Sequence, residues 1–361
     1  MDSSPTFQQA AWRRLKKNKG AVLGLVVIVL SVLVAVFAYF IAPDSSPYAN
    51  RIILEIGGEK PGSSREFVKV KKEKDVEATS FFARLASGKE DKYYYVPITA
   101  HEIKGDSIIV QKYIDEGLSE RIAYPLSQTA PAPVIKMKFI TGTDKYGRDI
   151  LSRIIVGTRV SLSVGLITVL ISLSIGLLLG SLAGFYRGKT DELIMWFINV
   201  IWSIPTLLLV FAITLALGKG FWQVFIAVGL TMWVNVARLV RGQVLAEREK
   251  EYIEATRALG FSDIRTIVRH VWPNIMGPVM VIAASNFASA IVIEAGLSFL
   301  GVGVQPPMPS WGLMIKENYN FIITQNPMLA LAPGFAIMLL VLAFNLFGNG
   351  LRDALNVRGR V

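Results

Sequence analysis

Few side chains in this sequence have the types and spacing that catalysis or metal binding requires. The chain has no cysteine, which excludes a thiolate nucleophile, thiolate metal ligands and disulfide bonds. Its two histidines, His101 and His270, are far apart in the sequence, so neither a histidine metal site nor a histidine-based triad is expected. Residues 188–190 (Gly-Lys-Thr) resemble the end of a phosphate-binding loop, but Ala183 stands where that loop requires glycine. The sequence therefore predicts a protein that is not an enzyme and hydrolyses no nucleotide itself.

A charged stretch between two long apolar runs predicts two short helices with a corner between them. Charged residues and alanines recur at helical spacing over residues 251–258, which predicts the first helix. Gly260 can supply the positive φ that helices favour just beyond their ends, and Ser262 is a good N-cap for a second helix. Pro273 marks the beginning of the next element. Two such helices at a membrane surface would form a rigid knob that a groove on a partner could receive.

The residues of this knob have separate expected roles. Ile264, Ile267 and Val268 would form one apolar face of the second helix. Glu254 would make a polar contact with the partner, and Gly260 would be the geometric corner. Ile253, Ala255 and Leu259 are candidates to fill the partner's groove. The full set of candidate docking residues is Glu251, Ile253, Glu254, Ala255, Thr256, Ala258, Leu259, Gly260, Phe261 and Pro273.

The composition indicates that membrane helices position these residues. Of the 361 residues, 52% are hydrophobic and 18% are charged, and the mean hydropathy of +0.47 is too apolar for an ordinary soluble protein. The first uncharged run is longer than the apolar core of a signal peptide and no clear cleavage site follows it, so we expect an uncleaved helix. Six uncharged runs are predicted to span a bilayer: 20–42, 160–186, 193–218, 220–237, 271–293 and about 328–350.

Three features inside these runs indicate how the helices pack. Pro205 lies near the middle of the third run, where proline commonly kinks a helix. Glu294 follows the fifth run, and an acid at membrane depth is a functional candidate, which we interpret as a buried packing or gating anchor and not as a proton carrier. In the second run small residues recur every four positions, which lets membrane helices approach closely: Thr168, Ser172, Gly176, Gly180 and Gly184.

Residues 43–158 differ from the rest of the chain because they are rich in charge and contain no run long enough to span. The segments 93–96 and 107–111 look like short strands, and residues 125–133 look like a linker back to the membrane. We therefore predict a small, mainly β insertion on the outer face. A solvated spacer between helices and a binding role are both compatible with this pattern.

The distribution of Lys and Arg predicts the orientation. These residues concentrate in 1–19, after the second run, around the knob and after residue 350, whereas the short loops on the opposite side hold only Lys219 and Lys316. The positive-inside rule then places both termini in the cytoplasm, and it explains the net charge of +11 without nucleic-acid binding. The predicted fold is an all-α polytopic membrane protein with six transmembrane helices, one N-terminal plus a five-helix core, and a β-rich extracytoplasmic insertion. Its predicted parts are a cytoplasmic tail (1–19), a first transmembrane helix (20–42), the insertion (43–158), a membrane core (159–350) with a cytoplasmic loop (243–274), and a second tail (351–361).

The knob resembles the cytoplasmic EAA loop of ABC-importer permeases, which has a Glu-Ala-Ala sequence, a later glycine and a terminal proline. Thr256 replaces the second alanine, and His270 and Trp272 replace an isoleucine and a leucine near the end. The ending with Asn274 is closer to the peptide and nickel branch of the family. The residues that match in place are Glu254, Ala255, Gly260 and Pro273.

Residues 142–162 strongly resemble the Gly-Thr-Asp-x-x-Gly-Arg-Asp…Ser-Arg…Gly-x-Arg-x-Ser-Leu signature of peptide and nickel permeases. Asp144, Arg148, Asp149 and Arg153 could pair locally and order a turn at the membrane mouth, and we favour such a structural clasp over substrate contact. The family also has a glutamate followed by Leu-Ser-Phe-Leu-Gly, as at Glu294 and residues 297–301. Asn349 stands where the family usually has an acid, so that acid's role does not carry over. The candidate mouth and gating residues are Gly142, Thr143, Asp144, Gly147, Arg148, Asp149 and Glu294.

The resemblance covers about residues 140–356 well and the first helix weakly. It implies an inner-membrane permease subunit of a peptide- or nickel-type ABC importer, of the dipeptide and oligopeptide branch, in a prokaryotic cytoplasmic membrane. The implied partners are a second permease subunit, which would form a heterodimer with this chain, one or two ABC ATPase subunits that hold ATP and Mg, an extracytoplasmic substrate-binding protein and the lipid bilayer. No cofactor or metal is expected in this chain.

Three alternatives are open from the sequence. Nickel complexes or another small solute could replace peptides as the imported substrate. An ion-gradient-driven secondary transporter would need paired charges within the spans, where Glu294 stands nearly alone. A membrane-anchored sensor that uses the 43–158 insertion would leave the knob unexplained.

Overall fold

The computed structural model describes residues 7–355 except 74–75, 77–78 and 324–325, and it divides into two compact units. The first unit is helical and comprises Met1–Ser31, Ser161–Gln305 and Ile337–Val361. The second unit, which contains the sheet, comprises Val32–Val160 and Pro306–Ala336. The end of the predicted C-terminal tail, residues 356–361, lies outside the described residues.

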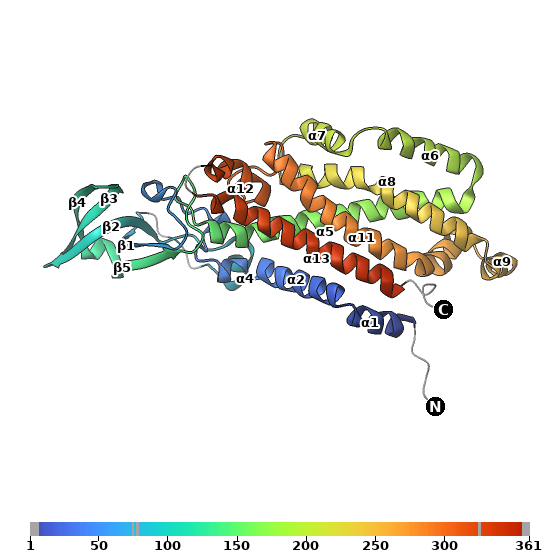
Figure 1. Ribbon diagram of the computed structural model, residues 1–361, viewed down its shortest axis with the longest axis horizontal. Helices are drawn as coiled ribbons and strands as arrows, with labels where there is room; N and C mark the ends of the chain where they lie inside the picture. The colour runs from blue at the N-terminus through green and yellow to red at the C-terminus, as the bar shows by residue number, and fades with distance from the viewer. Residues whose placement is uncertain (1–6, 74–75, 77–78, 324–325, 356–361) are drawn as a thin grey trace, which may run out of the picture. The chain divides into compact units, whose positions relative to one another are not determined.

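The long helices follow the apolar runs of the sequence (Figure 1). They are α2 (Lys19–Val36), α5 (Ile150–Tyr186), α6 (Gly188–Trp202), α7 (Thr206–Leu217), α8 (Phe221–Arg248), α11 (Trp272–Phe299) and α13 (Met328–Leu355). Within the described chain, five helical stretches are long and apolar enough to cross a membrane, or six if α6 and α7 count as one bent span. An additional helix, α1 (Phe7–Lys17), occupies the predicted N-terminal tail.

Two predictions about the spans were wrong, one about where a helix begins and one about its continuity. The second span was expected from Val160, but α5 begins at Ile150 and is continuous to Tyr186. The third span was expected to be one kinked helix, but it is broken into α6 and α7, whose axes differ by 90°. Pro205 stands immediately before α7, where its missing N–H and fixed φ are tolerated, so the proline separates two helices.

The predicted stripe of small residues on α5 is confirmed as a close helix contact within this chain. A Cβ atom added to Gly176 would lie 2.5 Å from the Val236 side chain, and one added to Gly180 would lie 2.5 Å from the carbonyl oxygen of Ala237. Ser172 accepts a hydrogen bond from the Asn286 amide at 3.5 Å. Residues without bulky side chains therefore allow α5 to lie directly against α8, as small residues do in membrane helix pairs.

The second unit contains a five-stranded antiparallel sheet with the order β4-β3-β2-β1-β5. Its strands are β1 (Ser63–Lys71), β2 (Tyr93–Lys104), β3 (Ser107–Asp115), β4 (Leu118–Pro125) and β5 (Thr129–Phe139). The stretch 125–133, expected as a linker, instead supplies the end of β4 and the first half of β5. Pro131 and Pro133 fit there because β5 is an edge strand, where a missing N–H donor is tolerated.

The sheet packs around a small apolar core. Val68 of β1, Ile98 of β2, and Ile108 and Val110 of β3 are almost fully buried in one cluster. Phe67 of β1 faces the opposite side of the sheet and packs in a second cluster with Ile53, Ile56 and Phe139. Short helices accompany the sheet in this unit: α3 (Ala38–Ile41), α4 (Phe81–Ser87) and α12 (Trp311–Asn318). The beginning of α5 and helix α12 carry the polar network described below.

Candidate functional site

A glycine corner connects helix α9 (Glu251–Ala258) to helix α10 (Asp263–Thr266). Gly260 has a φ of +73°, which confirms the predicted positive-φ stop. The N–H of Phe261 donates to the Thr256 carbonyl at 3.0 Å, and the N–H of Gly260 donates to the Arg257 carbonyl at 2.9 Å. These two bonds form a Schellman motif, which fixes the direction in which the chain leaves α9.

The inner side of the corner is attached to the helical core. Ile253 of α9 is fully buried and packs in one cluster with Phe185 of α5, Val244 of α8 and Ile267. Thr256 and Thr266 are also buried, and their hydroxyl oxygens lie 3.3 Å apart across the corner. The two short helices are therefore held against each other and against α8, and the corner is a rigid part of this unit.

The outer side of the corner is apolar and exposed. Leu259 is 70% exposed, Ile264 is 72% exposed and Val268 is 48% exposed. Large apolar side chains so exposed among charged residues are typical of a surface that a partner covers. Among the residues predicted to fill the partner's groove, Leu259 and Ala255 are exposed. The prediction was wrong for Ile253, because this side chain is buried in the core.

One expectation for the second helix was wrong, and the N-cap expected at Ser262 is confirmed in position only. Ile264, Ile267 and Val268 do not share one face, because Ile267 points into the core whereas Ile264 and Val268 are exposed. Ser262 occupies the N-cap position of α10, but its side chain makes no capping hydrogen bond. The exposed pair Ile264 and Val268 was therefore missed as a partner surface, although its i, i+4 spacing is visible in the sequence.

The corner is continuous with the helix that follows it. A π-helical segment, Ile267–Val271, joins α10 to α11, so one helical stretch extends from Asp263 to Phe299. Pro273 is in the first turn of α11, as predicted. The Tyr252 hydroxyl donates to Glu247 of α8 at 2.5 Å and accepts from Asn274 of α11 at 3.0 Å. Burial and the Glu247 contact raise the pKa of Tyr252, so this phenol is a neutral connector between α8, α9 and α11.

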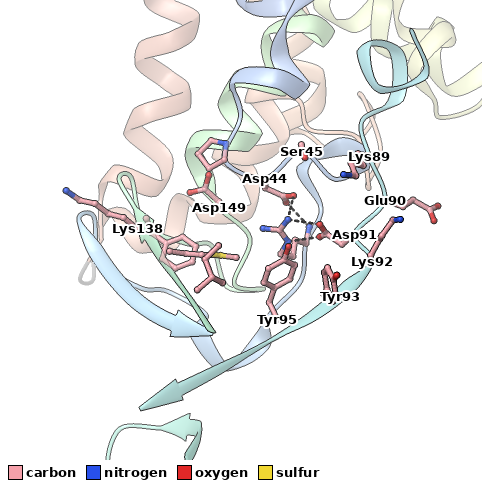
Figure 2. Close-up of a pocket in the computed structure, with 15 residues that line it drawn as sticks. Asp44, Ser45, Lys89, Glu90, Asp91, Lys92, Tyr93, Tyr95, Lys138 and Asp149 are labelled. Atoms are coloured by element: carbon pink, nitrogen blue, oxygen red, sulfur yellow. Dashed lines mark hydrogen bonds and ion pairs between the residues drawn. The ribbon is translucent and has the colours of Figure 1, made fainter. Parts of the chain in front are cut away.

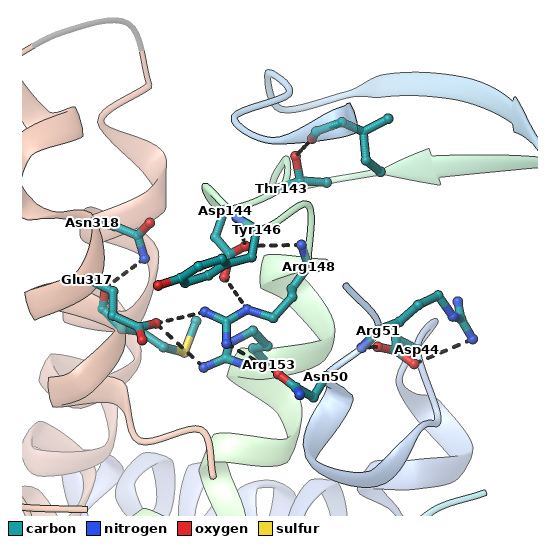
Figure 3. A network of polar contacts seen from close by, with 12 residues as sticks. Asp44, Asn50, Arg51, Thr143, Asp144, Tyr146, Arg148, Arg153, Glu317 and Asn318 are labelled. Atoms are coloured by element: carbon teal, nitrogen blue, oxygen red, sulfur yellow. Dashed lines mark hydrogen bonds and ion pairs between the residues drawn. The ribbon is translucent and has the colours of Figure 1, made fainter. Parts of the chain in front are cut away.

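The mouth motif forms a buried ion network in the second unit (Figure 3). The Arg148 guanidinium donates to Asp144 at 2.6 Å and to Glu317 of α12 at 2.8 Å. Arg153 is almost fully buried and lies 3.8 Å from the same Glu317 carboxylate. Asp144 also accepts hydrogen bonds from the N–H groups of Tyr146 and Arg148, which orders the turn. The network thus connects the motif to α12, and Glu317 was not anticipated from the sequence.

The expected local pairing within the motif is only partly found. Asp144 pairs with Arg148 as predicted, but Asp149 accepts from the N–H of Ser152 at 2.9 Å, as the N-cap of α5. Thr143 donates to the Ile56 carbonyl at 2.5 Å and accepts from the Glu59 N–H. The remaining candidates have a steric role: Gly142 and Gly147 have positive φ, and an added Cβ would collide with the carbonyl oxygens of Glu59 and Ile53.

Glu294 is fully buried in α11, in agreement with the expectation of a buried anchor. The Ser298 hydroxyl donates to Glu294 at 2.7 Å and accepts from the Val304 N–H at 3.1 Å. This acid therefore holds the turn that follows α11.

A cavity of about 390 Å³ in the helical unit lies beside the break between α6 and α7. None of its lining residues is charged, and several are hydroxyl or amide residues. Asn235 of α8 and Ser285 and Ser289 of α11 line the cavity and are exposed. Exposed polar groups on membrane helices are typical of a face that meets water or protein and not lipid.

Long apolar helices with one charged, structured corner outside the spans define a multi-pass membrane protein. A model of the family described as the binding-protein-dependent transport system inner membrane component matches residues 176–361. A model of the N-terminal TM domain of oligopeptide transport permease C matches residues 6–53. The chain belongs to the binding-protein-dependent transport system inner membrane component family, which consists of transport permeases and not enzymes.

Curated relatives cover about 60% of the chain. The glutathione transport system permease protein GsiD of Pectobacterium atrosepticum is 43% identical over 215 residues, which are 60% of this chain and 71% of the relative. The dipeptide transport system permease protein DppC of Alkalihalophilus pseudofirmus is also 43% identical, over 60% of this chain and 70% of the relative. The di/tripeptide transport system permease protein DppC of Pseudomonas aeruginosa is 44% identical over 61% of this chain and 72% of the relative.

Proposed function

We propose that this chain is a permease subunit of an ATP-driven peptide importer and forms half of the translocation pathway. A second permease subunit would supply the other half, and an extracytoplasmic binding protein would deliver the peptide. One or two separate ATPase subunits would hold ATP and Mg and supply the energy. The names of the relatives, which include glutathione, dipeptide and di/tripeptide permeases, support peptides over nickel complexes as the substrate.

The observation that carries this proposal is the exposed apolar surface of the corner, Leu259, Ile264 and Val268. The Schellman motif fixes the backbone of the corner, and packing against the core fixes its inner side. Docking therefore does not have to order this segment, so little conformational entropy is lost on binding. We infer that it inserts into a cleft on an ATPase subunit. Exposed Glu251, Glu254 and Arg257 would form the polar rim of that contact.

The mechanism follows from the helical continuity between the corner and α11. Because α10, the π-helical segment and α11 form one stretch, a displacement of the corner moves α11 directly. ATP binding would close the ATPase subunits, move the corner as a lever and rock α11 against the other spans. The uncharged, hydroxyl- and amide-lined cavity between α7, α8 and α11 would form part of the pathway wall, where it can hydrogen-bond peptide groups without selecting side-chain charge.

The proposed membrane arrangement counts α6 and α7 as one broken span, which gives six spans with both termini in the cytoplasm. The insertion that contains β1–β5 would then lie on the outer face. The Lys and Arg distribution supports this orientation.

Reconstitution of the complete importer tests the proposal. The chain, its partner permease and the ATPase subunits would be placed in proteoliposomes with the binding protein, and peptide uptake would be measured with and without ATP. Ile264→Glu should remove the ATPase subunits from the purified complex and abolish uptake, whereas the matched Ile103→Glu, at an exposed position of the insertion, should retain the ATPase subunits. ATP-independent uptake driven by an ion gradient would contradict the proposal.

A further inference from the structure

The second unit contains a cavity of about 400 Å³ that no part of the proposed mechanism uses (Figure 2). Its walls come from the segment after α3, the beginning of β2, the end of β5 and Asp149 of the mouth motif. A volume of this size fits a small molecule. The β2 and β5 walls belong to residues 54–175, which lie between the segments matched by the two family models.

The inner part of this cavity is acidic. Asp44 and Asp149 both line it and are both buried. Asp44 is satisfied, because its carboxylate accepts from the N–H groups of Ser46 and Arg51 at 2.9 and 3.0 Å. Asp149 is 7% exposed, and one of its oxygens accepts from Ser152. Its other oxygen, Oδ1, is buried and has no hydrogen-bond partner among the described residues.

An unsatisfied carboxylate oxygen in a buried position is costly and points to a missing donor. A buried polar group without a partner destabilises the fold, and it does so more strongly when it is charged. Burial also raises the pKa of Asp149, against the opposing effect of the Ser152 hydrogen bonds. A cationic donor at this position would satisfy the oxygen and stabilise the carboxylate. A metal ion is not indicated, because the described residues contain no group of three or more suitable metal-ligating side chains.

The exposed lining of the cavity carries more basic than acidic groups, namely Lys89, Lys92 and Lys138 against Glu90. Lys89 and Lys92 line it and are exposed, and neither forms an ion pair within the described chain. Arg51, by contrast, is committed to Asp91 through two hydrogen bonds of 2.7 and 2.8 Å. In the view of Figure 2, Asp149 lies on one side of the space that the lining residues surround and the two lysines lie on the other. Aromatic and apolar side chains, among them Tyr93 and Tyr95, also contribute to the lining.

We propose that this cavity binds a small zwitterion, with its ammonium group on Asp149 and its carboxylate at Lys89 and Lys92. This is the chemistry of a free amino acid and of the two ends of a short peptide. The inference rests on the proposed peptide import, to which it adds a peptide-binding site in the permease itself. The insertion is then more than a spacer, because its segment between α4 and β2 supplies Lys89 and Lys92 on the basic side of the site.

Binding to the full-length chain in lipid nanodiscs, without the binding protein, tests this site. The probe is trialanine, measured by isothermal titration calorimetry beside N-acetyl-trialanine, trialanine amide and alanine. Trialanine should bind, blocking the amine should weaken binding about tenfold or more, and blocking the carboxylate should also weaken it. Equal binding of alanine and trialanine identifies a free amino acid as the ligand, and tighter binding of trialanine identifies a peptide. Failure of trialanine and alanine to bind, or equal binding of the N-acetylated probe, overturns the proposal.

Variants locate the site. Asp149→Asn keeps an N-cap residue for α5 but removes the charge. It should therefore weaken the binding of trialanine about tenfold or more and leave the binding of N-acetyl-trialanine unchanged. Lys92→Glu, at an exposed position, should weaken the binding of trialanine. Arg121→Glu, at an exposed position of β4 outside the cavity, should leave that binding unchanged. The proposal is overturned if the Lys92→Glu and Arg121→Glu variants bind trialanine with equal affinity.

Uptake by the complete importer separates this proposal from the proposed function. Trialanine uptake by a complex whose permease shows no binding in the nanodisc experiment refutes the cavity site and leaves peptide import intact. Binding in the cavity together with no ATP-dependent uptake of any peptide refutes the proposed import.

Discussion

The hydroxyl oxygens of Thr256 and Thr266 lie 3.3 Å apart, on opposite sides of the corner between α9 and α10. Thr256 donates its proton to the Ile253 carbonyl at 2.7 Å, so Thr266 must donate to Thr256. Both threonines are buried. This pair therefore holds the two short helices together at the position where the related EAA sequence has an alanine.

Removing both hydroxyls of this pair should cost less than the sum of the costs of removing each one alone. Thr256→Val preserves the shape of the side chain but leaves the Thr266 hydroxyl buried without an acceptor, which should destabilise the corner by about 1–3 kcal/mol. The double variant Thr256→Val/Thr266→Val removes both polar groups and should be destabilised by less than the sum of the two single variants. Hydrogen exchange of the backbone amides in residues 256–268 measures this local stability. Additive effects would contradict a direct bond between the hydroxyls.

Gly260 should be required for its backbone conformation and not for space. A Cβ atom at this position would meet nothing within 4 Å, but the φ of +73° is unfavourable for a β-branched residue. Gly260→Val should therefore permit assembly and reduce transport-coupled ATP hydrolysis, because the corner changes direction. Gly242→Val in α8, where a Cβ atom also meets nothing within 4 Å and φ is not positive, is the control. The lever mechanism is wrong if Gly260→Val leaves both assembly and coupled ATP hydrolysis intact.

Glu317 should stabilise the second unit because it compensates the two buried guanidinium groups of Arg148 and Arg153. Glu317→Gln removes the carboxylate that pairs with Arg153 and also with Arg148, and it should destabilise the unit by about 3–5 kcal/mol. Glu249→Gln breaks the exposed ion pair with Arg187 and should cost at most about 1 kcal/mol. Thermal unfolding of the two purified variants distinguishes them, and equal midpoints would contradict a structural role for the network.

Close contact between α5 and α8 should make Gly180 intolerant of even a methyl group. Gly180→Ala places a Cβ atom 2.5 Å from the Ala237 carbonyl oxygen, which forces the helices apart. Gly277→Ala in α11 is the matched control, because its added Cβ would meet Leu355 at an ordinary 3.5 Å. We expect Gly180→Ala to lower the unfolding temperature and Gly277→Ala to leave it unchanged. Identical unfolding temperatures would contradict the prediction, because they would show that α5 and α8 accommodate the added methyl group.

The sequence predicted the elements better than it predicted the directions of their side chains. The positive φ of Gly260, the start of α11 near Pro273 and the packing stripe on α5 depend on local rules, and all are found. The sequence could not show that Ile253 is buried and Ile264 is exposed, because both the buried face and the exposed face of the corner carry apolar residues. Periodicity cannot separate a core from a partner surface in helices of four to eight residues.

Long-range partners explain the other differences. The charges of Arg153 and Arg159 suggested that the second span starts at Val160, but Arg153 is compensated by Glu317, which is far away in sequence. The prolines of 125–133 suggested a linker, because their tolerance depends on β5 being an edge strand, and strand order is not visible in a single sequence. The cavity beside Asp149 likewise depends on the meeting of three distant segments.

Thiol labelling at position 264 tests the docking corner most directly. The chain has no cysteine, so Ile264→Cys introduces a single thiol at a side chain that is 72% exposed. A membrane-impermeant maleimide should label it in inside-out vesicles stripped of the ATPase subunits, and adding those subunits back should protect it. Labelling from outside intact cells, or labelling that the ATPase subunits do not reduce, would contradict a cytoplasmic corner that docks into the ATPase.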